Sequence, residues 1–127
     1  MITTVLIVED ERLQAMALKS IFTALGLHVI GLASSCEEAV GKTRNQPPDL
    51  IIMDIQLEGD RTGVDAAQEI RRFCNCPIVF QSACTDATWI EKALRFPLSV
   101  LLNKNTCLAE WALVVQLFDQ NQIQMVA

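Results

Sequence analysis

Polar side chains come directly after four short apolar runs of the sequence. They comprise three carboxylates, a hydroxyl and an amine, namely Glu9, Asp10, Asp54, Ser82 and Lys104. Three neighbouring carboxylates repel one another, and each resists ionisation unless a cation neutralises it. Mg²⁺ suits such a set because it prefers oxygen ligands and keeps positions for phosphate oxygens. A carboxylate nucleophile, a divalent cation and two donors are the parts needed to transfer a phosphoryl group onto an aspartate.

These side chains can meet only if the runs before them lie side by side in one sheet. Apolar and β-branched residues predict five strands, at 4–8, 28–33, 50–53, 77–82 and 98–102. A helix is predicted after each of the five strands, with the fourth helix at 86–96. The helical stripes include Leu18, Ile21, Phe22 and Leu25; Val64, Ala67, Ile70 and Phe73; and Leu108, Trp111, Ala112, Val115 and Phe118.

Local signals mark where two of these helices begin and end. Gly26 is expected to end the first helix, because glycine adopts the left-handed backbone that closes helices. Ser35 and Glu38 form a capping-box pattern, in which each side chain satisfies a free backbone amide at the start of the second helix. That helix should end before Pro47, because proline disfavours helix in the residue ahead of it.

Strands that alternate with helices predict an α/β fold with three layers. Right-handed crossovers place helices on both faces of a parallel sheet, and strands buried on both faces are apolar almost throughout. In such a sheet, ligands bind beyond the carboxyl ends of the strands. The five polar residues end the first, third, fourth and fifth strands, so we expect them to converge at one edge.

Composition limits the classes of function. The chain has 127 residues, 51% of them hydrophobic, which is enough for one folded core. We expect a single domain over 1–127, with a core at about 3–119, a short tail at 120–127 and no output domain. Ten Lys and Arg against 15 Asp and Glu give a net charge of −5, which disfavours direct binding to nucleic acid or to anionic membranes. The sequence has no secretion signal or membrane-spanning run, so we expect a cytoplasmic protein.

Cysteine and histidine usage adds little chemistry. Five cysteines are an odd number in a chain without a secretion signal, so no disulfide framework is expected. The spacing of Cys74 and Cys76 does not match a zinc knuckle, and His28 is the sole histidine. The cysteines are therefore interpreted as small apolar residues.

Four motifs resemble those of the receiver domain of two-component response regulators. They are Val5–Glu11, Leu50–Ile55, Val79–Ala83 and Leu101–Lys104. The resemblance extends over essentially the whole chain and implies a flavodoxin-like (βα)5 doubly wound parallel sheet with strand order 2-1-3-4-5. It also implies a phosphorelay signalling domain that is not an enzyme beyond slow loss of its own phosphate.

The resemblance assigns a role to each acidic residue. Asp54 would be the phosphoacceptor, taking a phosphoryl group from a histidine kinase or a phosphotransfer protein. Glu9, Asp10 and Asp54 would hold Mg²⁺ together with the backbone carbonyl of Gln56. Phosphorylation would add negative charge at the end of the third strand and bias the conformation of the domain.

The resemblance also identifies residues that would respond to the phosphoryl group. Ser82 matches the switch hydroxyl and Lys104 the paired lysine, whereas Leu101, Cys84 and Ala83 occupy switch or modulating positions. The output surface would be the face of the fourth helix, fifth strand and fifth helix, which a downstream protein would bind. A homodimer is compatible with the same resemblance.

Three positions depart from the family pattern. Leu101 stands where an aromatic residue is usual, so aromatic gating is not expected. Asn105 replaces the proline that usually follows the lysine, and we expect a trans Lys104–Asn105 peptide because a cis bond before a non-proline residue costs about 2.5–4 kcal/mol. Glu58 replaces a common proline, and the loop has an extra residue before Gly63, so a looser loop is expected.

Two other functions remain open from the residues alone. Leu101 and Asn105 would also suit a receiver-like interaction module that is never phosphorylated. An aspartyl-nucleophile phosphohydrolase is less well supported, because the residue two positions after Asp54 is Gln56 rather than a second carboxylate. A flavin site is disfavoured, since the first strand is followed by acidic residues instead of an amide-rich phosphate loop.

Overall fold

Five parallel strands form one sheet in the order β2-β1-β3-β4-β5. The computed structural model describes residues 1–82 and 99–119. Within these ranges the strands are β1 Thr4–Val8, β2 His28–Ala33, β3 Leu50–Asp54, β4 Ile78–Ser82 and β5 Ser99–Asn103. The predicted α/β class and strand order are confirmed. The helix expected at 86–96, with Ala83 and Cys84 before it, and the tail expected at 120–127 lie outside the described residues.

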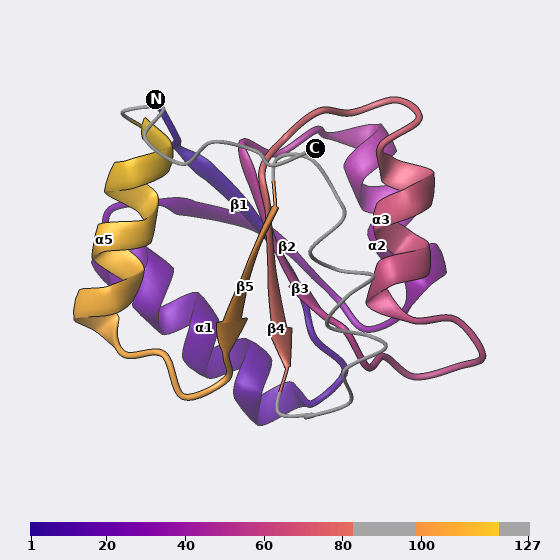
Figure 1. Ribbon diagram of the computed structural model, residues 1–127, viewed down its shortest axis with the longest axis horizontal. Coiled ribbons are helices and arrows are strands. Elements are labelled where there is room, and N and C mark those ends of the chain that lie inside the picture. Colours follow the sequence, from indigo (N-terminus) through magenta and orange to yellow (C-terminus); the bar gives the residue numbers. More distant parts are fainter. Residues whose placement is uncertain (83–98, 120–127) are drawn as a thin grey trace.

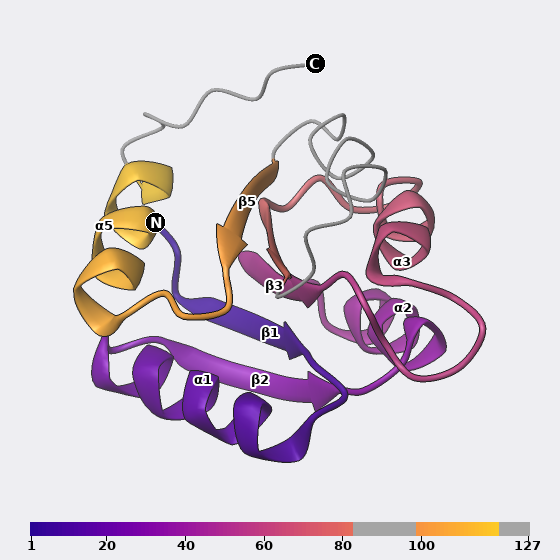
Figure 2. The same cartoon turned by 60° about the horizontal axis from the view of Figure 1, so that its bottom comes forward.

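Helices cover both faces of the sheet. They are α1 Arg12–Ala24, α2 Cys36–Asn45, α3 Gly63–Ile70 and α5 Leu108–Asp119. In Figures 1 and 2, α1 and α5 lie on one side of the strands, and α2 and α3 lie together on the other. None of the helices in the described parts of the chain is long and apolar enough to cross a membrane.

The central strands are buried because helices cover both faces of the sheet and their side chains pack under both layers. In β1, Leu6 and Val8 pack into the cluster beneath α2 and α3, whereas Val5 and Ile7 pack into the cluster beneath α1 and α5. Every residue of β3 is buried as well. Alternating side chains of a strand point to opposite faces, so these two strands hold both helical layers.

Trp111 connects α5 to α1 across the second cluster. Its side chain is fully buried, and its ring meets that of Phe22 edge to face, with ring centres 5.1 Å apart. Such aromatic pairs contribute about 0.5–1.5 kcal/mol beyond their burial. The packing fixes α5 close to the connection that carries Lys104.

Asp49 joins the beginnings of β1 and β3. Its Oδ2 accepts hydrogen bonds from the backbone amides of Thr3 and Thr4 at 2.9 and 3.1 Å, and its own amide donates to the Thr4 hydroxyl at 2.9 Å. These bonds stabilise the carboxylate, and the Thr3 amide makes the largest contribution to lowering the pKa of Asp49. The contacts lie at the opposite edge of the sheet from the polar strand ends.

The prediction of a capping box at the start of α2 is only partly correct. Ser35 caps α2 by accepting from the Glu38 amide at 3.2 Å, but the Glu38 carboxylate binds the amide and hydroxyl of Ser34 at 3.3 and 2.8 Å, so the predicted box is half formed. The complete capping box is at α3, where Thr62 and Asp65 bond each other's backbone amides.

Phe73 does not belong to the helical stripe in which it was predicted. α3 ends at Ile70, the turn that follows carries Phe73 outwards, and 37% of its surface is exposed. The Arg44 guanidinium covers the ring, with its carbon 4.4 Å from the ring centre. A cation over an aromatic face replaces the apolar packing that helical spacing predicts.

Candidate functional site

Three carboxylates meet at the carboxyl ends of β1 and β3. The two strands are neighbours, with Val8 opposite Met53, so the residues that follow them are brought together. Glu9, Asp10 and Asp54 each offer an oxygen, and these oxygens all lie within 4.8 Å of one another. Glu9 and Asp54 are each only 3% exposed, whereas Asp10 is open to solvent.

Lys104 pairs with both buried carboxylates. Its Nζ donates to Asp54 Oδ2 at 2.9 Å and lies 3.1 Å from Glu9 Oε1. Burial acts to lower the pKa of Lys104, but the nearby carboxylates of Asp54 and Glu9 outweigh it and raise that pKa. No peptide bond among the described residues is cis, so the expected trans Lys104–Asn105 bond is found, and the lysine still reaches the site.

Backbone amides hold the two buried carboxylates from the side opposite the lysine. The amide of Gln56 donates to Asp54 Oδ1 at 3.1 Å, and the amide of Glu11 donates to Glu9 Oε2 at 3.2 Å. Each amide comes two residues after the carboxylate that it binds, in the turn that leaves the strand. The carbonyl of Gln56, predicted as a metal ligand, stays a prediction.

The acidic residues are difficult to ionise together. Burial, followed by the hydrogen bond to Asp54 and its charge, raises the pKa of Glu9. Burial and then the neighbouring Glu9 raise the pKa of Asp10 in the same way. Lys104 neutralises one of the three charges, which leaves an excess of negative charge for a cation.

The oxygens of this cluster fit a divalent cation. Glu9 Oε1 is buried, and among the described residues no donor makes a hydrogen bond of regular geometry to this oxygen, although Lys104 Nζ lies 3.1 Å away. A buried carboxylate oxygen without an aligned donor is an available ligand, and carboxylates with an open side suit Mg²⁺. The set of Glu9, Asp10 and Asp54 therefore has the chemistry of a magnesium site.

Gly63 presses against the backbone of Asp54. A Cβ at this position would lie 2.0 Å from the Asp54 carbonyl oxygen, and the Gly63 amide donates to the Ile55 carbonyl at 2.7 Å. The first residue of α3 thus fixes the end of β3. The sequence alone did not predict this contact, because close approach of two backbones leaves no periodic signal.

The loop from β3 to α3 is tied to its surroundings. Glu58, expected to loosen this loop, accepts a hydrogen bond from the Ser34 hydroxyl at 2.7 Å and forms a bridge with Ser35. Arg61 pairs with Glu69 and lies 3.7 Å from Glu37. The replaced proline is therefore compensated by contacts with α2 and α3.

The remaining predicted residues lie on β4 and β5. Ser82 ends β4, opposite Asn103, and the residue before it, Gln81, lies opposite Asp54 and is buried. Gln81 was not predicted, because a single amide in an apolar strand is a weak signal. Leu101 packs against the cluster beneath α2 and α3, where it fills the place of the usual aromatic residue.

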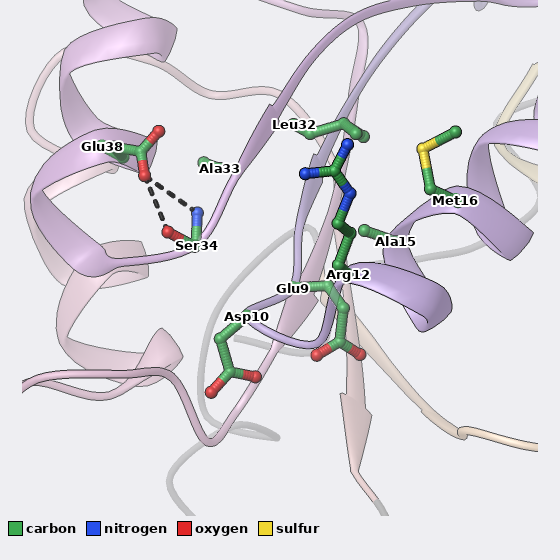
Figure 3. Close-up of a pocket in the computed structure, with 9 residues that line it drawn as sticks. All are labelled: Glu9, Asp10, Arg12, Ala15, Met16, Leu32, Ala33, Ser34 and Glu38. Carbon is green, nitrogen blue, oxygen red and sulfur yellow. Dashed lines mark hydrogen bonds between the residues drawn. The ribbon is translucent and has the colours of Figure 1, made fainter.

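A pocket of about 370 Å³ lies beside the acidic cluster, between α1 and the connection from β2 to α2. Figure 3 shows the Glu9 and Asp10 carboxylates pointing in one direction, while the Arg12 guanidinium extends the other way toward Leu32. Arg12 therefore does not neutralise the carboxylates, and this task falls to Lys104.

The chain matches a known family over most of its length. The family model of the response regulator receiver domain covers residues 5–116. The chain belongs to the response regulator receiver family. Receiver domains are in general signalling domains rather than enzymes, and they bind Mg²⁺ through acidic residues such as those that meet here.

Three curated relatives show how the receiver sequence is used elsewhere. The phyllosphere-induced regulator PhyR of Methylorubrum extorquens is 39% identical over 84 residues, which is 65% of this chain and 32% of PhyR. The transcriptional regulatory protein PdtaR of Mycobacterium tuberculosis is 38% identical over 70% of this chain and 43% of PdtaR. The chemotaxis protein CheY of Thermotoga maritima is 36% identical over 72% of this chain and 76% of CheY. The matches with PhyR and PdtaR thus span less than half of those proteins.

Solved receiver structures share the fold. The signal receiver domain of a modulated diguanylate cyclase from Desulfovibrio desulfuricans G20 superposes with a TM-score of 0.83 at 30% identity, over 96% of this receiver and 98% of that chain. The receiver domain of PhyR from Erythrobacter litoralis gives a TM-score of 0.78 at 26% identity, over 98% and 94% of the two chains. The flavodoxin-like architecture of this receiver is confirmed by both.

Proposed function

We propose that this receiver takes a phosphoryl group on Asp54 from the phosphohistidine of a histidine kinase or a phosphotransfer protein. The observation that carries the proposal is the contact of the Lys104 ammonium with Asp54 Oδ2 at 2.9 Å, beside the carboxylates of Glu9 and Asp10. A buried carboxylate with a fixed cation on one oxygen is oriented for attack through the other oxygen.

The transfer exchanges one phosphorus bond for another. An oxygen of Asp54 forms a bond to phosphorus, and the bond between phosphorus and the histidine nitrogen breaks with its electron pair going to that nitrogen. The histidine leaves neutral, because its other ring nitrogen carries a proton. Mg²⁺, held by Glu9, Asp10 and Asp54 with the Gln56 carbonyl, would supply positive charge for the phosphoryl oxygens. Lys104 pairs with a phosphoryl oxygen once Asp54 is an acyl phosphate, and Ser82 donates a hydrogen bond to another.

The output of the receiver is a change at a protein-binding face. Ser82 and the modulating positions Ala83 and Cys84 follow one another in the chain, so movement of Ser82 toward the new charge is passed to the segment after β4. The face that includes β5 and α5 would then bind a downstream protein or a second copy. We place this signalling in the cytoplasm, with no direct role in nucleic-acid binding and no catalytic activity beyond slow loss of the phosphate.

Intact mass measurement tests the proposal. The full chain is incubated with Mg²⁺ and a small acyl phosphate, and a gain of about 80 Da is expected for one phosphoryl group. Asp54→Asn should abolish the gain, Lys104→Ala should slow it, and Asp60→Asn, which changes an exposed carboxylate in the next loop, should leave it unchanged. A receiver that gains no mass under these conditions would instead be the unphosphorylated interaction module.

A further inference from the structure

Two cysteines lie in the connection from α3 to β4, away from the acidic site. Cys74 and Cys76 are separated by Asn75. Cys76 is buried, at 9% exposure, and Cys74 is partly buried. Both side chains pack on the same cluster beneath α2 and α3, so they lie on the same side of the chain. Neither thiol is in a disulfide.

The two thiols lie near each other in a stretch of backbone that hydrogen bonds hold in place. The side chains of Cys74 and Arg71 are both close enough to the Cys76 thiol to influence its pKa. Arg71 Nη1 also donates to the carbonyl oxygen of Cys74 at 3.3 Å. The Cys74 amide donates to the Ile70 carbonyl at 2.9 Å, and the Pro77 carbonyl accepts from the Ile51 amide of β3 at 3.0 Å. The cysteine pair is thus anchored at both ends.

We propose that Cys74 and Cys76 form a dithiol–disulfide pair that a peroxide oxidises. The Cys74 sulfur attacks one peroxide oxygen, the O–O bond breaks, and the hydroxide that leaves takes the thiol proton to become water. The Cys76 sulfur then attacks the sulfenic acid on Cys74, the S–O bond breaks, and a second water leaves with the Cys76 proton. In sum, two thiols and one hydrogen peroxide give one disulfide and two waters.

Burial sets the order of these two steps. Cys74 is the more exposed thiol and is reached first by a peroxide. Burial, the largest cause, raises the pKa of Cys76 to about 12, so Cys76 stays protonated while Cys74 reacts. The Cys76 thiol then stands beside the sulfenic acid on Cys74 and gives up its proton in the step that forms the disulfide.

Two other described cysteines provide the comparison. Cys36 is buried at the start of α2, and Cys107 is exposed just before α5. Helix α5 lies on the opposite face of the sheet from α3, as Figure 2 shows. Cys107 is accessible to peroxide but belongs to the other helical layer from the pair. It therefore serves as the matched control thiol.

Peptide mass analysis tests the pair. The full chain is treated with hydrogen peroxide, the remaining thiols are alkylated, and chymotrypsin cuts after Phe73 and Phe80, which separates the pair from Cys84. The peptide of residues 74–80 should lose about 2 Da, for two hydrogens, and carry no alkyl group. Dithiothreitol should restore both alkylation sites. Cys107→Ser should leave the loss unchanged.

The variants make the outcome decisive. Cys74→Ser replaces a partly exposed side chain, so the variant should stay folded, which a thermal unfolding curve checks. It should eliminate the loss of about 2 Da. Cys76→Ala should also eliminate it. The proposal is overturned if the peptide keeps both alkyl groups in the folded protein, if Cys74 instead gains about 32 Da as a sulfinic acid, or if dithiothreitol does not reverse the change.

Discussion

Gly63→Ala should destabilise the protein through the backbone of the acceptor strand. A Cβ on Gly63 would sit 2.0 Å from the Asp54 carbonyl oxygen and 2.9 Å from the Met53 side chain. The first contact is with backbone, which cannot rotate away, so α3 or the end of β3 must move. Such a shift also weakens the 2.7 Å hydrogen bond from the Gly63 amide to the Ile55 carbonyl.

The size of the effect follows from three contributions. Overpacking costs about 1–3 kcal/mol, and loss of a buried backbone hydrogen bond costs about 1–3 kcal/mol. Alanine offsets about 1 kcal/mol of this, because it favours helix over glycine. A net loss of about 3 kcal/mol in the free energy of unfolding is expected, which lowers Tm by about 10 °C in a domain of this size.

Gly41→Ala is the matched control. Gly41 lies within α2, and a Cβ there would meet no atom within 4 Å. Alanine should therefore raise the free energy of unfolding by about 0.5–1 kcal/mol. Urea and thermal unfolding of both variants measure the difference. If Gly63→Ala is as stable as the native protein, or gains stability as Gly41→Ala does, the backbone contact with Asp54 does not exist in solution.

Three further changes probe other parts of the fold. The pKa of Asp49 is lowered in the folded state, so its carboxylate stabilises the protein above the unfolded pKa, and this contribution is lost as pH falls through the folded pKa. Asp49→Asn should be less stable than the native protein at pH 7, and the gap should shrink in acid unfolding curves; a constant gap would contradict the linkage. Thr43 is fully buried, and its hydroxyl has no partner in the part of the chain that the structure describes, so Thr43→Val should raise the free energy of unfolding by about 1 kcal/mol in urea titrations; a clear loss would mean that the hydroxyl is bonded. Lys104→Met leaves Glu9 and Asp54 without their shared cation, so Mg²⁺ should raise the Tm of this variant more than that of the native protein; an equal rise would separate the lysine from the metal site.

The α/β class and the convergence of the acidic residues were predictable because each depends on a strong local pattern, whereas the strand order was implied by the resemblance to the receiver family. The β-branched run in β1 and the apolar run in β3 can form only buried strands, and the rule for parallel sheets then brings Glu9 and Asp54 to one edge. The exact partner of Glu38 was not predictable. Ser34 and Ser35 both offer a donor near the start of α2, and the structure, rather than the pattern, decides between them.

The remaining differences come from tertiary contacts that sequence spacing does not encode. Phe73 has the right spacing for the α3 stripe, yet the helix ends at Ile70 and Arg44 covers the ring instead. Asn105 removes the usual proline, and the lysine still reaches Asp54 and Glu9 through the trans bond that was predicted. Gly63 and Gln81 gain their importance from the atoms opposite them in space.

The central claim is that Asp54 is the residue that carries the phosphoryl group. The most direct measurement treats the full chain with Mg²⁺ and a small acyl phosphate and then reduces the product with borohydride, which converts an aspartyl phosphate into homoserine. Tandem mass spectrometry should find homoserine at position 54 in the peptide that contains the end of β3, and unchanged Glu9 and Asp10 in the peptide that contains the end of β1. Homoserine at another aspartate, or an unmodified Asp54 in protein that has gained a phosphoryl group, would contradict the account.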